Sequence, residues 1–333
     1  MFRSSSTSVG LFHDSYFINI EATRFHEGKF VIIRDKNNSF MLLFAWHGTI
    51  LPKVMPALAV VVSLSALLVY LSAAHFLTMP EVPAIGFTIF GVILSIFLSF
   101  RNTACYDRWW EGRKLWGALI ANTRHIIRDS HVLEDSQRQI LMYRVMLFCY
   151  LLRDRLRHQA TDIQHFQNAV NLSDGQWQQC AEHINAPQYL LEIIQKDLVL
   201  FYKQGQISDI IYSTLTRHTV AMGDIHAGCD RIMTTPLPFS YSVLLHRAVY
   251  SFCLILPFSI EASFGIWTPV IVALIAYLFL GLDALSAELE EPFGLQENDL
   301  PLNSIVRNIE REMLSSLGAE IPPVLSSYKG NLS

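Results

Sequence analysis

The stretch GVILSIFLSFRNTACYDRWWEG, from Gly91 to Gly112, joins an apolar half to a charged half with no proline or glycine between its ends. The apolar half ends at Phe100, and the charged half carries arginine, aspartate, glutamate and two adjacent tryptophans. No proline occurs between Pro83 and Pro187. Because proline breaks helices, we predict that one helix continues from the apolar half into the charged half over about 40 residues, or roughly 60 Å at about 1.5 Å per residue.

The composition is that of a membrane protein. Of the 333 residues, 51% are hydrophobic and only 16% are charged, whereas soluble domains carry about 25% charged residues. The net charge of −4 gives no reason to expect a nucleic-acid partner. The five cysteines form no CxxC pair, which argues against a disulfide framework or a zinc site and favours buried, reduced thiols facing a cytosol.

Four segments are apolar enough and long enough to cross a bilayer, which takes about 20 residues. They lie at roughly 54–77, 82–100, 237–260 and 265–285. They form two hairpins, separated by a polar region at 101–235 in which apolar residues recur at helical spacing. We therefore predict an all-α polytopic membrane protein with four transmembrane helices and a helical region outside the membrane.

Lysine and arginine predict the orientation. The short connections around 72–83 and 261–269 contain neither residue, whereas the first 53 residues, the middle region and the C-terminal tail all contain them. Basic loops remain in the cytoplasm. Both termini and the region 101–235 are therefore expected on the cytoplasmic side.

Two stripes with a spacing of four run along the second span. The small-residue stripe consists of Gly91, Ser95 and Ser99. The bulky stripe, one step around the helix, consists of Val92, Ile96 and Phe100. Small residues allow membrane helices to approach closely. The bulky stripe has two interpretations that periodicity does not separate: it faces lipid or core, or it lines a pore as a hydrophobic constriction that gates by dewetting.

Charged side chains near the spans suggest ion pairs. Arg247 lies beside His246 within the third span, where ionisable groups are costly and often functional. We favour a structural ion pair of Arg247 with Asp283 or Glu288, near the end of the fourth span, over a role in permeation. After the second span, pairs between helical turns are expected among Asp107, Arg108, Glu111 and Arg113. The adjacent Trp109 and Trp110 form an interfacial belt or pack between this helix and the cytoplasmic region.

Four local patterns, taken together with the four-span layout, point to one family. They are LFAWHGTILPKV (Leu43–Val54), GVILSIFLSFRNTACYDRWWEGRKLWG (Gly91–Gly117), GCDRIMTTPLPFSYSVLLHRAVY (Gly228–Tyr250) and LDALSAELEEPFGLQENDLPL (Leu282–Leu302). The combination resembles the bestrophin family of ion channels, specifically its bacterial branch. The resemblance covers residues 31–305 as a channel domain, with 1–30 as an N-terminal extension and 306–333 as a C-terminal tail.

The resemblance implies a homopentamer around one central pore in the cell inner membrane, with membrane lipids and small permeant ions as its other partners. The neck positions fall on Val92, Ile96 and Phe100, and a second, cytoplasmic constriction falls on Ile210, with Ile211 as the neighbouring candidate. The implied function is passive permeation of chloride and other small monovalent anions through a hydrophobic neck gate.

Two alternatives remain open. The neck has fewer aromatic residues than animal bestrophin necks, and aromatic ring edges are electropositive, so a monovalent cation channel of the same architecture is possible. A non-conducting membrane scaffold or sensor is the other alternative. We expect no enzyme, because no HExxH helix or paired carboxylates with a histidine appear in the sequence.

The segment EPFGLQENDLPL corresponds to the calcium clasp of animal bestrophins. It keeps only Glu297 and Asp299 as carboxylates, whereas calcium sites take about six to eight oxygen ligands. The pattern favours a solvated helix end and turn over a metal site. No cofactor is therefore expected, and calcium dependence is not predicted.

Overall fold

The computed structural model describes residues 31–32, 48–76, 84–160, 166, 169–325 and 331–332. Within these residues the protein is helical, apart from one two-stranded pairing in which β1 (Val31–Ile32) runs antiparallel to β2 (Asn331–Leu332). The larger helices are α2 (Leu51–Ala73), α3 (Ala84–Asp129), α4 (Asp135–Leu156), α6 (Ala186–Lys203), α7 (Asp209–Thr234), α8 (Phe239–Phe264), α9 (Thr268–Glu290) and α10 (Leu302–Leu317). The short helices are η1 (Ser130–Val132), α5 (Asp174–Glu182) and η3 (Gly265–Trp267).

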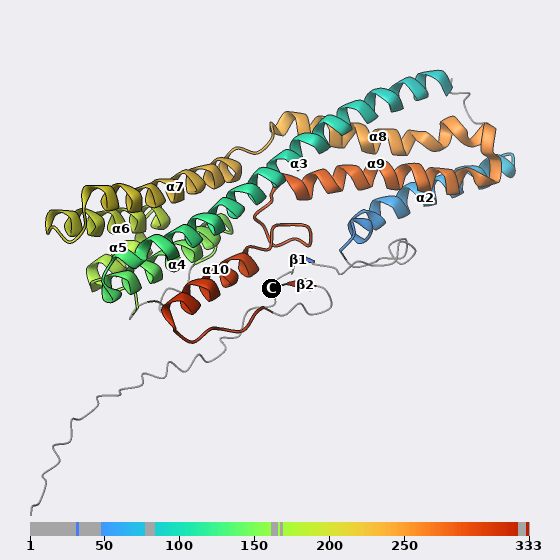
Figure 1. Ribbon diagram of the computed structural model, residues 1–333. Coiled ribbons are helices and arrows are strands. Elements are labelled where there is room, and N and C mark those ends of the chain that lie inside the picture. Colours follow the sequence, from blue (N-terminus) through green and yellow to red (C-terminus); the bar gives the residue numbers. More distant parts are fainter. Residues whose placement is uncertain are drawn as a thin grey trace, which may run out of the picture.

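Helix α3 extends from one end of the helical part of the molecule to the other (Figure 1). It spans 46 residues without a break, so the prediction of one helix across Phe100 is confirmed, and the helix is somewhat longer than expected. Its first half lies with α2, α8 and α9, and its second half lies with α4, α6, α7 and α10 (Figure 1). One rigid element therefore connects two separately packed ends.

The first half of α3 contributes to a core that we call the hairpin core. It joins α2, α3, α8 and α9, and its buried members include Val61, Leu94, Leu98, Val249, Phe252, Val272 and Ala276. Phe252 stacks against Phe87 with ring centroids 4.6 Å apart and contacts Phe279 at 4.8 Å. Apolar burial of this kind brings the two helical hairpins together around one side of α3.

The second half of α3 contributes to a larger core that we call the bundle core. Its buried members include Trp116, Leu119, Met142, Phe148, Leu190, Met222, Ile225, Ile305 and Met313. They come from α3, α4, α6, α7 and α10. Here the large apolar side chains of α3 are buried by helices of its own chain, whereas in the hairpin core bulky apolar side chains on one side of α3 stay uncovered.

The apolar helices begin and end within a few residues of the predicted spans, as expected for boundaries judged from sequence. Pro52 and Pro269 lie in the first turns of α2 and α9, where proline is tolerated because the first amide groups have no helical acceptor. The chain reverses between α8 and α9 at Gly265, whose φ of +48° suits a residue without a Cβ.

Three helical runs in the described part of the chain are long and apolar enough to cross a membrane: Leu51–Ala73, Ile85–Val132 and Phe239–Glu290. The third run consists of α8, η3 and α9, and its two long helices lie side by side (Figure 1).

The polar region and the cysteines have two further features. Ser173 caps α5 through a capping box with Gln176. All five cysteines are free and buried, and burial raises the pKa of the Cys149 thiol to about 12. Apart from Val31 and Ile32, the first 47 residues lie outside the described part, so the proposed extension at 1–30 stays a prediction.

Candidate functional site: the neck stripe of α3 and its polar anchor

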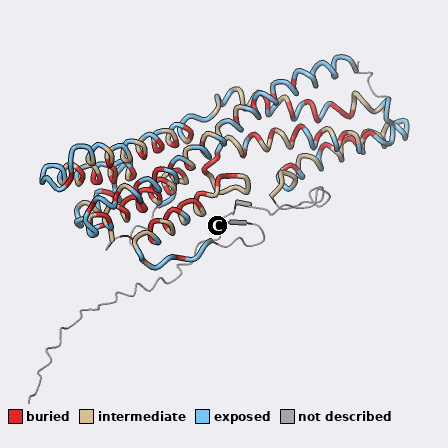
Figure 2. The backbone as a smooth tube through the Cα atoms, in the orientation of Figure 1, coloured by how far each residue is buried: buried red, intermediate tan, exposed pale blue. Residues whose placement is uncertain are grey.

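The bulky stripe of α3 is exposed in the single chain. Val92 is 55% exposed, Ile96 is 49% exposed and Phe100 is 63% exposed. Leu94 and Leu98 face the opposite way and are buried in the hairpin core. Figure 2 shows the same contrast along the first half of α3, with exposed positions on its outer side. We call Val92, Ile96 and Phe100 the neck stripe.

The small-residue stripe packs only at its first member. A Cβ on Gly91 would lie 3.3 Å from the Phe252 ring, so glycine allows α8 to approach α3 closely there. Ser95 and Ser99 are exposed, and the Ser95 hydroxyl donates to the Gly91 carbonyl at 2.7 Å. Within one chain Leu94 and Leu98 supply the buried face after Gly91, so packing at Ser95 and Ser99 stays a prediction.

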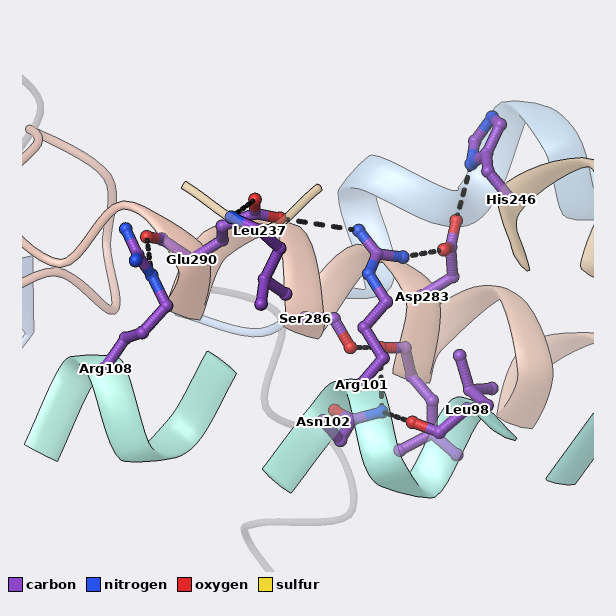
Figure 3. A network of polar contacts seen from close by, with 10 residues as sticks. Leu98, Arg101, Asn102, Arg108, Leu237, His246, Asp283, Ser286 and Glu290 are labelled. Carbon is purple, nitrogen blue, oxygen red and sulfur yellow. Dashed lines mark hydrogen bonds and ion pairs between the residues drawn. The ribbon is translucent and has the colours of Figure 1, made fainter. Parts of the chain in front are cut away.

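Arg101 follows the neck stripe directly and anchors it through a buried polar network (Figure 3). Its side chain is 5% exposed, and its Nη1 donates to Asp283 Oδ1 of α9 at 2.5 Å. The other oxygen of Asp283 lies 2.7 Å from His246 Nδ1 of α8, and Arg101 Nη2 lies 3.8 Å from Glu290 Oε2. The network therefore connects α3, α8 and α9 at the residue that follows Phe100.

Hydrogen bonds to backbone groups extend the network around Arg101. Asn102 Nδ2 donates to the carbonyls of Leu98 at 3.1 Å and Leu282 at 3.4 Å. Glu290 Oε1 accepts from the amide of Leu237 at 3.1 Å, in the segment between α7 and α8. A buried charge is tolerated only when it is paired and hydrogen-bonded, and these contacts supply such partners at the end of the apolar half of α3.

The ion pair expected for Arg247 does not form. Arg247 is exposed and has no ion pair or hydrogen bond within the part of the chain that the structure describes. Asp283 pairs with Arg101 instead, and Glu288 forms an ion pair with Lys53 of α2. Sequence reasoning missed Arg101 because it counted as the first residue of the polar region, although its spacing from Leu94 and Leu98 places it on the buried face.

Of the four charged residues expected to pair between turns of α3, Arg108 and Glu111 bridge to other helices instead, whereas Asp107 and Arg113 have no ion pair or hydrogen bond among the described residues. The Arg108 guanidinium donates to three backbone carbonyls: Ile232 and Thr235 at 2.6 Å each, near the end of α7, and Glu290 at 3.2 Å. Glu111 forms an ion pair with Arg231 of α7. Since the last carbonyls of a helix lack intrahelical partners, Arg108 satisfies the ends of α7 and α9 together.

The two adjacent tryptophans have different surroundings. Trp109 packs against the bundle core and donates from Nε1 to the Asn298 carbonyl at 3.0 Å, whereas Trp110 is 46% exposed. Trp109 therefore follows the core-packing interpretation, joining α3 to the loop after α9.

Glu297 and Asp299 lie in the loop after α9. Asp299 is buried and accepts from the Gln296 amide at 2.6 Å, and burial raises the pKa of its carboxyl group to about 7. The ammonium group of Lys53 lies 2.5 Å from Gln296 Oε1 and pairs with Glu288. Among the described residues no three His, Cys, Asp or Glu side chains are grouped for a metal ion, and the expected independence from calcium stays a prediction.

Ile210 and Ile211 lie in the first turn of α7 and point to different surroundings. Ile210 is 72% exposed, whereas Ile211 packs against a small core of Leu133, Leu198, Ile207 and Leu215. Ser208 begins the helix and accepts from the Ile211 amide at 3.3 Å. The two neighbours are thus distinguished by burial, which the sequence left open.

Comparison with known proteins identifies the relatives of this chain. The family model for bacterial and fungal bestrophin proteins matches residues 31–315. A voltage-dependent anion channel-forming protein of Mesorhizobium japonicum is 36% identical over 90% of this chain and 96% of its own length. The protein YneE of Escherichia coli, which carries the same description, is 35% identical over 88% of this chain and 96% of its own.

Solved structures agree with the sequence relatives. The crystal structure of a bacterial bestrophin homolog from Klebsiella pneumoniae is 30% identical to this chain and superposes with a TM-score of 0.72. The match covers 80% of this chain and 99% of the homolog. The chain therefore belongs to the bacterial and fungal bestrophin family.

Proposed function

We propose that this protein is a homopentameric channel of the cell inner membrane that conducts small monovalent anions through a hydrophobic neck. Helices α2, α3, α8 and α9 cross the bilayer, and both termini and the helices of the bundle core lie in the cytoplasm. Residues 31–305 form the channel domain, with 1–30 and 306–333 as its flanking segments. The names of the relatives, which describe anion channel-forming proteins, support the choice of anions.

The exposed neck stripe is the observation that carries this proposal. Three bulky apolar side chains face away from every helix that covers the opposite side of α3. One chain cannot enclose a pore with one helix, whereas copies related by cyclic symmetry can each contribute one helix to a common axis. In such a ring Val92, Ile96 and Phe100 form successive apolar constrictions.

An apolar neck explains a gate without a solid plug. Water is poorly held in a narrow apolar passage, so the neck empties and blocks ions until it widens. The Arg101 network begins at the residue after Phe100 and connects α3 to α8 and α9. A shift of these helices relative to one another would therefore reach the neck.

Ile210 supplies the second constriction in this proposal. Its exposure at the start of α7 supports it over Ile211, which packs within the chain. A ring of five exposed isoleucines would narrow the cytoplasmic end of the same pathway.

Planar bilayers with the purified full-length protein test the proposal. We expect Ile96→Ala to give larger or less gated single-channel currents, because truncation widens the apolar passage. Ile255→Ala is a matched control: Ile255 is 46% exposed but lies on α8, so its truncation should leave the currents unchanged. Equal effects of the two variants would contradict the neck assignment.

Two further measurements separate the alternatives. Reversal potentials under a salt gradient distinguish a chloride channel from a monovalent cation channel of the same architecture. Native mass spectrometry of the detergent-solubilised protein tests the pentamer. Silent bilayers over a range of salts and voltages would favour the scaffold or sensor.

A further inference from the structure

The face of α3 that carries the neck stripe continues as an exposed polar face beyond Phe100. Asp107 lies seven residues after Phe100 and Lys114 seven residues after Asp107, and both are exposed. Because an α-helix has about 3.6 residues per turn, seven residues are about two turns and roughly 10 Å along the axis. Ile96 and Lys114 are separated by about five complete turns. Asp107 and Lys114 therefore lie on the same face of α3 as Ile96.

Asp107 differs from the other charged residues near the neck. Arg101 is buried against Asp283, Arg108 donates to backbone carbonyls of α7 and α9, and Glu111 pairs with Arg231. Asp107 has no ion pair or hydrogen bond among the described residues. It is therefore the charged group closest to the neck stripe on that face whose charge is not compensated within its own chain.

We propose that Asp107 sets the charge preference of the pore at the cytoplasmic end of the neck, as a ring of five carboxylates that attracts cations and opposes anions. This inference rests on the proposed pentamer with α3 as its neck helix. Rings of carboxylate side chains are one means by which channels favour cations. Val92, Ile96 and Phe100 carry no charge, so the neck itself contributes little to this choice.

Distance determines which charged ring dominates. At an ionic strength of about 0.1 M the Debye length is about 10 Å, comparable with the axial separation of Asp107 from Phe100. Lys114 lies roughly 21 Å from Phe100 along the axis at about 1.5 Å per residue, so its positive charge acts on the neck more weakly. Asp107 therefore reduces the anion preference of the channel, and Lys114 opposes it only in part.

The test is the chloride-to-potassium permeability ratio of the full-length protein in planar bilayers, from reversal potentials under a KCl gradient. We expect this ratio to rise from wild type to Asp107→Asn and again to Asp107→Lys. Because a potential acts with opposite sign on chloride and potassium, a change of about threefold in this ratio corresponds to about half a kT of potential acting on each ion. Lys114→Gln should lower the ratio by a smaller factor. The charge effects should shrink at about 1 M salt, where the Debye length is about 3 Å.

Glu192 provides the matched control. It is exposed on α6 and has no partner among the described residues, so Glu192→Gln and Glu192→Lys make the same charge changes away from α3. A ratio that does not respond to Asp107, or responds equally to Glu192, overturns the inference. Loss of the oligomer in Asp107→Asn, measured by native mass spectrometry, also overturns it, because Asp107 would then act in assembly.

The Ile96→Ala variant keeps the two proposals separate. If wild type conducts and Ile96→Ala changes the currents while the Asp107 variants do not, the neck stands and only the Asp107 inference fails. If wild type does not conduct, the proposed channel fails and the Asp107 inference fails with it.

Discussion

The two halves of α3 carry apolar side chains of similar kind in opposite settings. In the second half, Trp116 and Leu119 are fully buried among helices of the same chain. In the first half, Ile96 and Phe100 are half exposed or more, with their own chain covering only the other side. Hydrophobicity alone therefore does not assign a role to these residues. The role depends on which neighbours cover each face of the helix, and the proposed channel assigns the uncovered face to contact with other copies and permeant ions.

The boundary between the halves is polar, and its two arginines hold α3 to a neighbouring helix. Arg101 and Arg108 lie two turns apart, and each connects α3 to α9. One is paired with a buried carboxylate and the other with backbone carbonyls. Helix α3 is thus divided into a half with an uncovered apolar stripe, a polar boundary, and a half whose large apolar side chains are buried.

Replacing Arg101 should be the most damaging change. Arg101→Ala leaves Asp283 buried without its cation, and breaking a buried pair costs about 3–5 kcal/mol. We expect a large loss of thermal stability in detergent, measured by the unfolding midpoint. Arg247→Ala removes an exposed arginine from the neighbouring helix and should have little effect. A similar loss in both variants would mean that the Arg101 network does not anchor the neck.

Truncation of Leu119 should cost more stability than truncation of Ile96. Leu119→Ala opens a cavity in the bundle core, which costs about 2–5 kcal/mol, whereas changes at surface positions usually stay within about 0.5 kcal/mol. Chemical or thermal unfolding of both variants in the same detergent measures the contrast. If Ile96→Ala were the more destabilising, the neck stripe would be core rather than pore.

Arg108 should matter more than Arg231, although both connect α3 to α7. Arg108→Gln removes the donor for the half-buried carbonyls of Ile232 and Glu290, at about 1–3 kcal/mol for each group left unsatisfied. Arg231→Gln breaks a mostly exposed pair with Glu111, and such pairs contribute about 0–1 kcal/mol. The unfolding midpoints of the two variants at low and high salt check this order, and salt should weaken only the Arg231 contribution.

The smallest effect concerns pH and the bundle core. Burial lowers the pKa of His226 on α7 below its ordinary 6.5, and Asp230 only partly opposes this. The unfolded chain therefore takes up a proton at a higher pH than the folded chain, so folding stability should fall as pH decreases below about 6.5. We expect wild type to lose a few degrees of thermal stability between about pH 7.5 and 5.5 relative to His226→Gln. A shift of equal size in both proteins would assign the pH dependence to other groups.

Much of the fold could be predicted from local patterns. The apolar segments, the long helix without proline and the N-cap at Ser173 depend on residues close together in sequence, so periodicity and propensity are sufficient. Ion pairs depend on which helix faces are brought together. Arg247 was the expected partner of Asp283, but the rotation of α8 exposes Arg247 and places His246 on that carboxylate instead.

The neck shows the same division between local and tertiary information. The spacing of Val92, Ile96 and Phe100 is sufficient to put them on one face, because an α-helix has a fixed rotation per residue. It does not decide whether that face is covered, since coverage depends on how α8 and α9 pack. Likewise, the sequence by itself placed Ile210 beside Ile211, and only the packing of α7 buried one and exposed the other. The amino-acid sequence thus determined the helices and their faces, and the tertiary structure decided which faces α3 and α7 keep uncovered, because burial is a property of neighbours that are distant in the chain.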